Sequence, residues 1–444
     1  MTQTTAAPPQ AVRTAPASVR DRAVKRRRVL DILDASGKDA LLLTTHTALT
    51  WYLDGSRVHI SLAGDPIAAL LVDRGGDHLV TFNNEAGRIE AEELPSGVSL
   101  HSVPWYGNLH EAAAAVGLPG TNAVPLAEAD VAAELRAARQ HLLPNESTRY
   151  ASLSAEVAAL MTDVLSTARP ETTEFELVSA LAARVVAAAV GTTGKAAPLA
   201  EAAIAAELRA ARQQLLPAES ARYARLSADV AAIMTDVLST ARPETTEFEL
   251  VSALAARVVA AGAEPLVLLC NGSSRSEFRH PLATHSPLGR RAMAVVCARR
   301  DGLVANITRW VRFDAGTPEE RDAEARIAAV EADIFDATVP GARLDRIFAE
   351  IQAAYARHGF GAEQWELHHQ GGPAGYAGRD PRVTAAATDT VVLNQAFTWN
   401  PSGPGVKIED TVQLTESGLQ VLTVDPRWPT TTVNGLERPA TLQL

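Results

Sequence analysis

The sequence predicts an α+β protein in which a small α/β domain precedes a larger mixed domain. Three changes of pattern along the 444 residues support this fold class. Short apolar runs alternate with turn residues between residues 39 and 82, an Ala-, Glu- and Arg-rich helical pattern follows from Leu126, and strand-like runs return from Pro265. With 47% hydrophobic residues, the chain has enough apolar material for two or three globular domains.

The first domain is expected to span residues 21–127, after an Ala-, Pro- and Thr-rich tail at residues 1–20 that we expect to be disordered. Its apolar runs DALLLTT, IAALLVD and HLVTF, the last two separated by Gly75-Gly76, predict a hairpin within a small α/β domain. A basic cluster at Lys25–Arg28 lies in the apparent helix VKRRRVLDILDAS and is interpreted as a solvated helix face.

A tandem repeat follows, because residues 134–188 recur as residues 207–261 with only six differences. The differences are His141/Gln214, Asn145/Ala218, Thr148/Ala221, Ser152/Arg225, Glu156/Asp229 and Leu160/Ile233. Two copies are too few for a solenoid. Residues 128–205 are therefore interpreted as a linker helix with a duplicated helical segment. Its first copy is expected to form an extra lobe, either mobile or exchanged with a partner chain.

Both copies of the repeat carry the same helix-start signal. Thr173 with Glu176, and Thr246 with Glu249, form capping-box sequences that follow a helix-breaking proline. The two copies are therefore predicted to form the same helices. The second copy continues directly into a strand-like run. It is therefore expected to pack where this segment would lie in a domain without the duplication.

Residues 206–444 are expected to form the larger domain. Its strand-like runs are EPLVLLC, AMAVVCAR, LVANITRWVRF, TDTVVLNQAFTWN, VKIEDTVQLT and LQVLTVD. A long helical stretch between Pro318 and Gly359 interrupts them. This order predicts a mixed domain with a curved, antiparallel sheet.

Composition and charge exclude several classes of partner. The net charge of −11 would repel a phosphate backbone, so no nucleic acid is expected. The sequence contains no apolar run of 18 residues or more and no signal-peptide core, so we expect no membrane and a cytoplasmic protein. Cys270 and Cys297 lie in apolar runs and are too few to staple the chain, which fits a reducing compartment.

Three segments resemble the pita-bread superfamily, peptidase family M24, which includes methionine and Xaa-Pro aminopeptidases, prolidases and creatinase. They are RHPLATHSPLGRRAMAVVCARRDGLVANITRWV, LHHQGGPAGYAGRD and FTWNPSGPGVKIEDTVQLTESGLQVLT. The resemblance covers about residues 217–425, and TALTWYLDG is similar to the small domain of prolidases and creatinase. It implies a creatinase-like N-terminal α/β domain and a C-terminal pita-bread domain, with the duplicated helical segment between them.

The resemblance also implies where a pair of divalent ions would be bound, and most of those ligands are missing. The five ligand positions of the metal-dependent members fall near or on Cys297, Asn306, Gly372, Asn400 and Glu409. Glu409 alone is an anionic ligand, and one carboxylate cannot hold two hard cations. We therefore expect no metal and no other cofactor.

His280 and Glu409 are the candidate catalytic residues. His280 matches the family's active-site histidine that is not a ligand, and in creatinase, which works without metal, that histidine shuttles a proton. A histidine suits this role because its ordinary pKa lies near working pH. The alternative is a satisfied core or loop histidine. Cys297 is a further candidate nucleophile, although a cysteine in an apolar strand usually packs.

The candidate substrate-binding residues are His368, His369, Arg379 and Asn400. His368 matches another active-site histidine, and the His pair is also a possible soft-metal site. Arg379 resembles the arginine with which creatinase grips a carboxylate, a role that suits a planar guanidinium. A surface salt bridge is the alternative. Asn400 replaces a glutamate that creatinase keeps, which puts creatine hydrolysis in doubt.

These residues support three hypotheses about function. The first is a metal-independent, creatinase-like hydrolase or lyase that acts on a C–N bond of a small amino-acid-derived or peptide-like substrate. The second is an inactive pita-bread pseudoenzyme that binds a peptide or a protein partner. The third is an Xaa-Pro aminopeptidase with an unusual set of metal ligands. Because family members commonly dimerise, we also expect a homodimer.

Overall fold

The computed structural model describes residues 19–61, 64–116, 124–169, 171–187 and 205–444. Contacts divide these residues into two compact units, one up to Ala159 and one from Leu160 onward. The boundary falls within helix α6 (Pro144–Thr167), which belongs in part to each unit. The division at residues 127 and 205 drawn from the sequence stays a prediction. No helix in the described ranges is long and apolar enough to cross a membrane.

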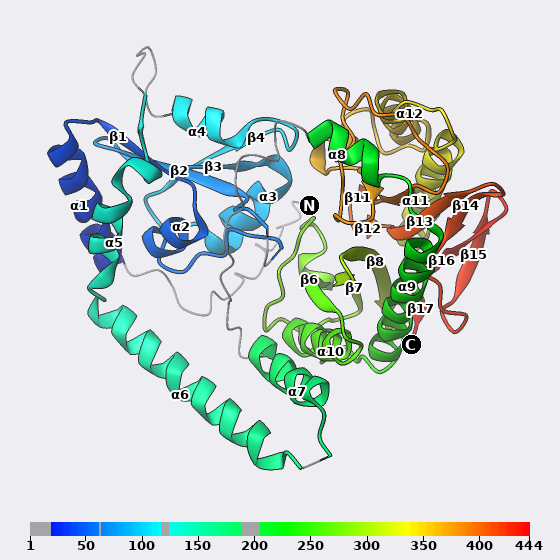
Figure 1. Ribbon diagram of the computed structural model, residues 1–444, viewed down its shortest axis with the longest axis horizontal. Coiled ribbons are helices and arrows are strands. Elements are labelled where there is room, and N and C mark those ends of the chain that lie inside the picture. The colour runs from blue at the N-terminus through cyan, green and yellow to red at the C-terminus, as the bar shows by residue number, and fades with distance from the viewer. Residues whose placement is uncertain (1–18, 62–63, 117–123, 170, 188–204) are drawn as a thin grey trace, which may run out of the picture. The chain divides into compact units, whose positions relative to one another are not determined.

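Unit 1 is built on a five-stranded sheet in the order β4-β3-β2-β1-β5 (Figure 1). Its strands are β1 (Ala40–Leu43), β2 (Ala68–Asp73), β3 (Asp77–Phe82), β4 (Ser99–Val103) and β5 (Leu126–Ala127). The three central strands pair antiparallel, and the two edge strands join in parallel. The Gly75-Gly76 turn joins β2 to β3, which confirms the predicted hairpin.

Helices cover both faces of this sheet. They are α1 (Val19–Ser36), α2 (His46–Tyr52), α3 (Asn83–Arg88), the π-helical turn η1 (Ile89–Glu93), α4 (Leu109–Val116), the 3₁₀ turn η2 (Glu128–Val131) and α5 (Ala132–Gln140). α1 and α2 contribute Val29, Leu33 and Leu49 to the larger core, whereas α4 packs Leu109 and Ala113 on the opposite face. Every residue of β2 is buried, as expected for a strand covered on both sides.

The basic cluster of α1 is a solvated face only in part, since Arg27 is exposed, and this corrects the prediction from sequence for Lys25 and Arg26. Lys25 is buried, and its Nζ lies 2.8 Å from both Asp54 Oδ1 and Glu146 Oε1. Arg26 pairs with Asp77. Buried charges are tolerated when they are paired. The pattern of α1 could not reveal this, because the partner carboxylates come from distant parts of the chain.

Unit 2 contains two four-stranded sheets. The first has the order β17-β8-β7-β6, and the second has the order β14-β13-β10-β9. The strands of the first are β6 (Glu264–Gly272), β7 (Arg291–Arg300), β8 (Leu303–Arg312) and β17 (Leu442–Gln443). Those of the second are β9 (Gly371–Ala374), β10 (Ala396–Trp399), β13 (Asp410–Thr415) and β14 (Gly418–Val421). Two short ribbons, β11–β12 (Ser402–Gly403 and Val406–Lys407) and β15–β16 (Thr430–Val433 and Leu436–Pro439), complete the unit.

The long β7–β8 hairpin turns at Asp301-Gly302, where both residues have positive φ. An Asp-Gly pair suits such a tight turn, because the turn requires the left-handed region at both positions. β8 is buried along its whole length and lies beside β13 through a bridge between Thr308 and Glu409. This bridge brings the two sheets together.

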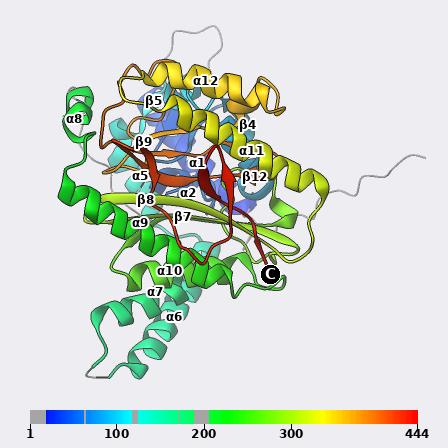
Figure 2. The ribbon, with the colours of Figure 1, turned by 90° about the vertical axis from the view of Figure 1, so that its right-hand side faces the viewer.

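Helices also cover both sides of the β7–β8 hairpin (Figure 2). α9 (Pro217–Leu238) and α10 (Glu247–Ala260) pack on one side, with α7 (Glu174–Ala187) against α10 and the short α8 (Ala205–Arg212) before α9. α11 (Pro318–Ala337) and α12 (Leu344–Arg357) lie on the other side. The mixed composition confirms the predicted α+β class.

Both copies of the repeat form the helices that the sequence predicts. Glu249 N donates to Thr246 Oγ1 at 3.2 Å, and Thr246 N donates to Glu249 Oε2 at 2.7 Å. The same reciprocal bonds join Thr173 and Glu176. The two capping boxes are therefore confirmed, at the starts of α10 and α7.

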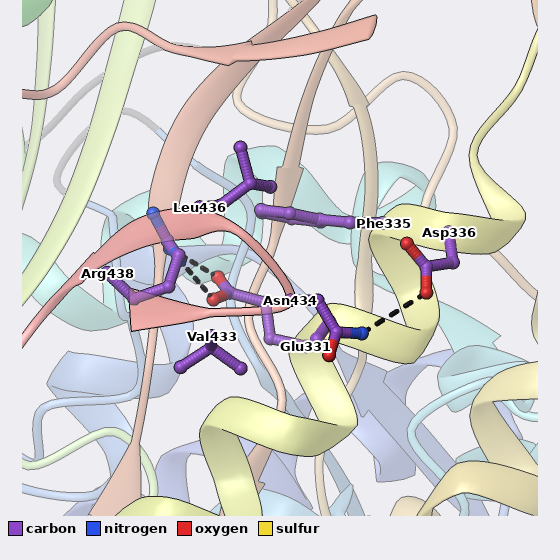
Figure 3. Close-up of a pocket in the computed structure, with 8 residues that line it drawn as sticks. Glu331, Phe335, Asp336, Val433, Asn434, Leu436 and Arg438 are labelled. Atoms are coloured by element: carbon purple, nitrogen blue, oxygen red, sulfur yellow. Dashed lines mark hydrogen bonds and ion pairs between the residues drawn. The ribbon is translucent and has the colours of Figure 1, made fainter. Parts of the chain in front are cut away.

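A buried network of charges joins α11 to the C-terminal strands. Arg438 on β16 donates two hydrogen bonds of 2.7 Å to Glu331 on α11 and one of 2.8 Å to Asp410 on β13. Arg309 on β8 also donates to Asp410, at 2.9 Å. Figure 3 shows the Glu331–Arg438 pair beside a cavity of about 10 Å³, which has room for about one water molecule.

Loss of Arg438 should destabilise this unit strongly. In Arg438→Met we expect the free energy of unfolding to fall by about 3–5 kcal/mol, because Glu331 would be left buried without its cation, whereas Asp410 would keep Arg309. Urea denaturation measures the change. Arg427→Met is the control, because Arg427 is exposed and its ion pairs are screened by water. Equal losses in the two variants would contradict the role given to burial.

Candidate functional site

Three histidines predicted to belong to the site come together in unit 2. His280 Nε2 and His368 Nε2 lie 2.9 Å apart, so one ring donates a hydrogen bond and the other accepts it. The rings of His368 and His369 are stacked with their centres 4.5 Å apart, and the ring of His280 lies 5.7 Å from that of His369. His368 is completely buried, and His280 is 8% exposed. The cluster therefore combines two buried rings, His280 and His368, with the half-buried ring of His369.

A buried ion pair fixes the loop that carries His280. Glu247, in the first turn of α10, pairs with Arg275, and it accepts hydrogen bonds from the Gly272 and Thr284 backbone amides at 2.7 and 2.9 Å. Arg275 also donates to Leu282 O at 3.0 Å. The loop is thus held on both sides of His280, which positions the ring.

His368 and His369 lie just before β9, at a turn that requires glycine. Gly371 and Gly372 have φ values of 100° and 145°. A Cβ atom on Gly372 would lie 2.5 Å from Pro381 O, and one on Gly371 would overlap with Thr398 O. Gly372 is the position at which the resemblance places a metal-binding histidine. The backbone therefore leaves no room there for such a side chain.

Burial and charge keep the two adjacent histidines neutral. Burial lowers the pKa of both His368 and His369 well below the usual value, and neighbouring basic groups lower it further. These groups are Lys407, Arg279, Arg379 and Arg382. The surroundings of the cluster are thus positive, although the whole chain carries a net charge of −11.

Glu409 forms the second part of the site. It is buried where β8 meets β13, and its Oε1 lies 2.6 Å from Arg379 Nη2. Its Oε2 lies 2.9 Å from Lys407 Nζ and accepts a hydrogen bond of 2.6 Å from the Thr308 hydroxyl. Burial alone would raise the pKa of Glu409, but Lys407 and Arg379 outweigh it and lower the pKa to about 2. The carboxylate is therefore ionised and held by two cations.

The remaining predicted positions have structural contacts. Asn306 donates from Nδ2 to Thr398 Oγ1 at 3.2 Å, and Asn400 donates from its backbone to Gln370 O at 3.1 Å. Burial and the charge of Glu409 raise the pKa of Cys297 to about 12. A neutral thiol is a poor nucleophile, so packing is the better interpretation of Cys297.

The residues at the family's ligand positions do not fit a pair of divalent ions. Both oxygens of Glu409 are already bound to cations or to a hydroxyl, Cys297 keeps its proton, and Gly372 cannot be replaced by a ligand. The three histidines offer nitrogen atoms within 4.8 Å of one another. However, the basic groups around them repel a cation, so this cluster is also a poor metal site.

Sequence reasoning missed three residues that organise the site. Lys407 neutralises Glu409, and Glu247 with Arg275 positions the His280 loop. Lys407 was detectable, because alternate residues of an extended segment share a face and it lies two residues before Glu409. Glu247 carried no such signal, since its partner lies 28 residues further along the chain.

Comparisons with known proteins agree with the motifs. The model of "Metallopeptidase family M24" matches residues 222–416. No curated protein matches. The chain is similar to solved structures of an Xaa-Pro dipeptidase from Bacillus anthracis (13% identity, TM-score 0.46, covering 95% of this chain and 100% of that one) and of the dipeptidase PepE from Mycobacterium ulcerans (16%, 0.47, 97% and 100%). It is also similar to an X-Pro aminopeptidase from Thermotoga maritima (14%, 0.46, 92% and 98%).

These structural likenesses lie below a TM-score of 0.5 and carry no inference about chemistry. The family match has a different basis, because it covers the histidine cluster, Glu409 and the strands that hold them. The match covers residues 222–416, less than half of the chain, and agrees with the resemblance of the motifs to the pita-bread peptidases.

Proposed function

We propose that the chain is a metal-independent hydrolase that acts on a C–N bond of a small amino-acid-derived or peptide-like substrate bearing a carboxylate. The observation that carries this proposal is the buried His280–His368 hydrogen bond within positive surroundings. The histidine pair supplies a proton acceptor and donor, and the basic groups favour an anionic substrate.

The proposed reaction uses one water molecule. His280 takes a proton from the water while the water oxygen forms a bond to the substrate carbon. The C–N bond then breaks, and the protonated histidine returns the proton to the leaving nitrogen. His368 accepts or donates the hydrogen bond to His280 and thereby keeps the ring in the tautomer that each step requires.

Arg379 and Glu409 have a more restricted role than the sequence suggested. The sequence assigns Arg379 to a substrate carboxylate and Glu409 to an amine or a proton, but in the structure they pair with each other. A substrate carboxylate would have to replace Glu409 as the partner of Arg379, and Lys407 would then remain to neutralise Glu409. His369 and Asn400 stay candidate contacts for the substrate.

A second candidate function is that of a pseudoenzyme that binds a peptide or a protein partner. The two ion pairs of Glu409 favour it, because a carboxylate that is bound by two cations can hold the structure together without taking part in a reaction. The cavity beside Arg438 is lined by none of the predicted site residues. An Xaa-Pro aminopeptidase is less well supported, since it needs the metal ions that the donor set does not fit.

Replacement of His280 separates the first two functions. We expect His280→Ala to lower kcat/KM by about 10²–10⁴-fold, the usual contribution of a general acid or base, while the melting temperature changes little. The assay follows amine release from a panel of N-acyl amino acids, guanidino acids and Xaa-Pro dipeptides. His285→Ala is the control, because His285 is exposed on the same loop. Hydrolysis that survives His280→Ala unchanged would exclude this role, and a wild-type protein inactive on the whole panel would favour the pseudoenzyme.

The metal content tests the third function. We expect elemental analysis of the purified protein to find far less than one equivalent of divalent metal, and a strong chelator to leave both activity and melting temperature unchanged. The reason is that no cation is needed to neutralise Glu409. A stoichiometric metal whose removal abolishes hydrolysis would restore the metallopeptidase.

The stability of the protein should reflect the neutral state of His368. Its pKa is lowered in the folded chain, whereas an unfolded histidine titrates near 6.5. The contribution of neutral His368 to the free energy of unfolding is therefore complete above about pH 6.5. It is lost as the pH falls through that value toward the folded-state pKa, because the unfolded state alone takes up the proton. Between about pH 6.5 and 5 we expect the wild type to lose up to about 1.4 kcal/mol per pH unit relative to His368→Gln. Urea denaturation at several pH values measures this, and an equal pH dependence of the free energy of unfolding in the two proteins would contradict it.

A further inference from the structure

The two copies of the repeat have nearly the same sequence but differ in burial. In the second copy, Tyr223, Met234 and Leu238 of α9 are 0% exposed, packed against β8 and its neighbours. Their counterparts in α6 of the first copy are Tyr150, 64% exposed, Met161, 40% exposed, and Leu165, 47% exposed. α6 of the first copy therefore exposes the apolar face that α9 of the second copy buries.

The substitutions between the copies hardly touch this face. Five of the six differing positions are exposed in the second copy, namely Gln214, Ala218, Ala221, Arg225 and Asp229. The sixth is buried Ile233, which is Leu160 in the first copy. An exchange of Ile for Leu keeps the volume, and such swaps change an equilibrium constant by about tenfold or less.

The first copy also carries the side chains that make the polar contacts of the second copy. Asp229 accepts a hydrogen bond of 2.7 Å from Arg300, and the first copy offers the carboxylate of Glu156 at this position. Glu247, which holds the His280 loop through Arg275, corresponds to Glu174. The capping box already forms in both copies.

We propose that the face of the sheet now covered by α9 and α10 is a docking surface for either copy of the repeat, and that the two copies exchange on it within one molecule. In the second form, α6 and α7 cover β6–β8 and supply Glu174 to Arg275. Residues 217–260 are then displaced, and α5 is followed directly by the docked copy.

In the present form the first copy makes contacts of its own. Glu146 pairs with Lys25, and Arg149 pairs with Asp54 at 2.6 Å, both within unit 1. In the second copy the residue equivalent to Glu146 is Glu219, which accepts a hydrogen bond from Tyr376 instead. Because identical side chains serve different partners, the exchange replaces one set of contacts by the other.

The exchange can be detected by chemical cross-linking. Two double variants, D229C/R300C and E156C/R300C, are treated with a short bismaleimide, and the products are identified by mass spectrometry. Both are expected to give intramolecular links, the first reporting the present form and the second the exchanged form. The protein without introduced cysteines is the control, since Cys270 is buried and the half-buried thiol of Cys297 stays protonated because its pKa is raised to about 12. The proposal is overturned if E156C/R300C gives no link, or links only between molecules.

Substitution in each copy provides an independent test. Leu238→Asp places a charge at a completely buried position, yet docking of the first copy should let this variant melt cooperatively within a few degrees of the wild type. Leu165→Asp should be tolerated equally, whereas the double variant L165D/L238D should lose cooperative melting, because neither copy can then dock. Loss of cooperative melting in Leu238→Asp alone would refute the exchange, and so would a stable double variant.

The two tests reinforce each other. Adding Leu238→Asp to E156C/R300C should raise the yield of the intramolecular link several-fold, and adding Leu165→Asp should abolish it. An unchanged yield in either case would contradict the proposal. Neither measurement depends on catalytic activity, so the results test the exchange independently of the proposed hydrolysis.

Discussion

The burial of Glu409 is the constraint on which the site in unit 2 depends. A carboxylate enclosed where two sheets meet must be neutralised, because an unpaired buried charge would be too unfavourable. Lys407 and Arg379 meet this requirement, and Thr308 ties the same carboxylate to β8. The side chain thus joins the sheets and fixes two cations beside the histidine cluster.

The same principle positions the rest of the site. Glu247 and Arg275 form a buried pair that holds the loop of His280, and Arg438 with Glu331 attaches α11 to the C-terminal strands. In each case a cation and a carboxylate that are distant in sequence meet in the core. Removing one partner leaves a buried charge, which is why such pairs fix a geometry firmly even where their net contribution to stability is small.

Much of the candidate site was predictable from sequence, but its electrostatics were not. The motifs that carry the family resemblance selected His280, His368 and Glu409, and the structure brings the histidines together. The motifs did not reveal that Arg379 is bound to Glu409, because an ion pair between residues 30 positions apart leaves no pattern. The resemblance implies that Gly372 stands at the family's histidine position, and the structure adds that its φ of 145° and the nearby Pro381 carbonyl leave no room for a side chain.

The repeat shows most clearly what the sequence determines and what the tertiary structure determines. The sequence by itself determined that both copies form two helices, because proline breaks, capping boxes and apolar spacing act over a few residues and are the same in both. The local pattern is nearly the same in both copies although Tyr150 is exposed and Tyr223 is buried, so the prediction that the second copy packs rested on its direct run into the next strand. Burial requires a surface to pack against, and only the tertiary structure provides one, here the sheet of β6–β8 that the second copy adjoins through its direct connection to β6.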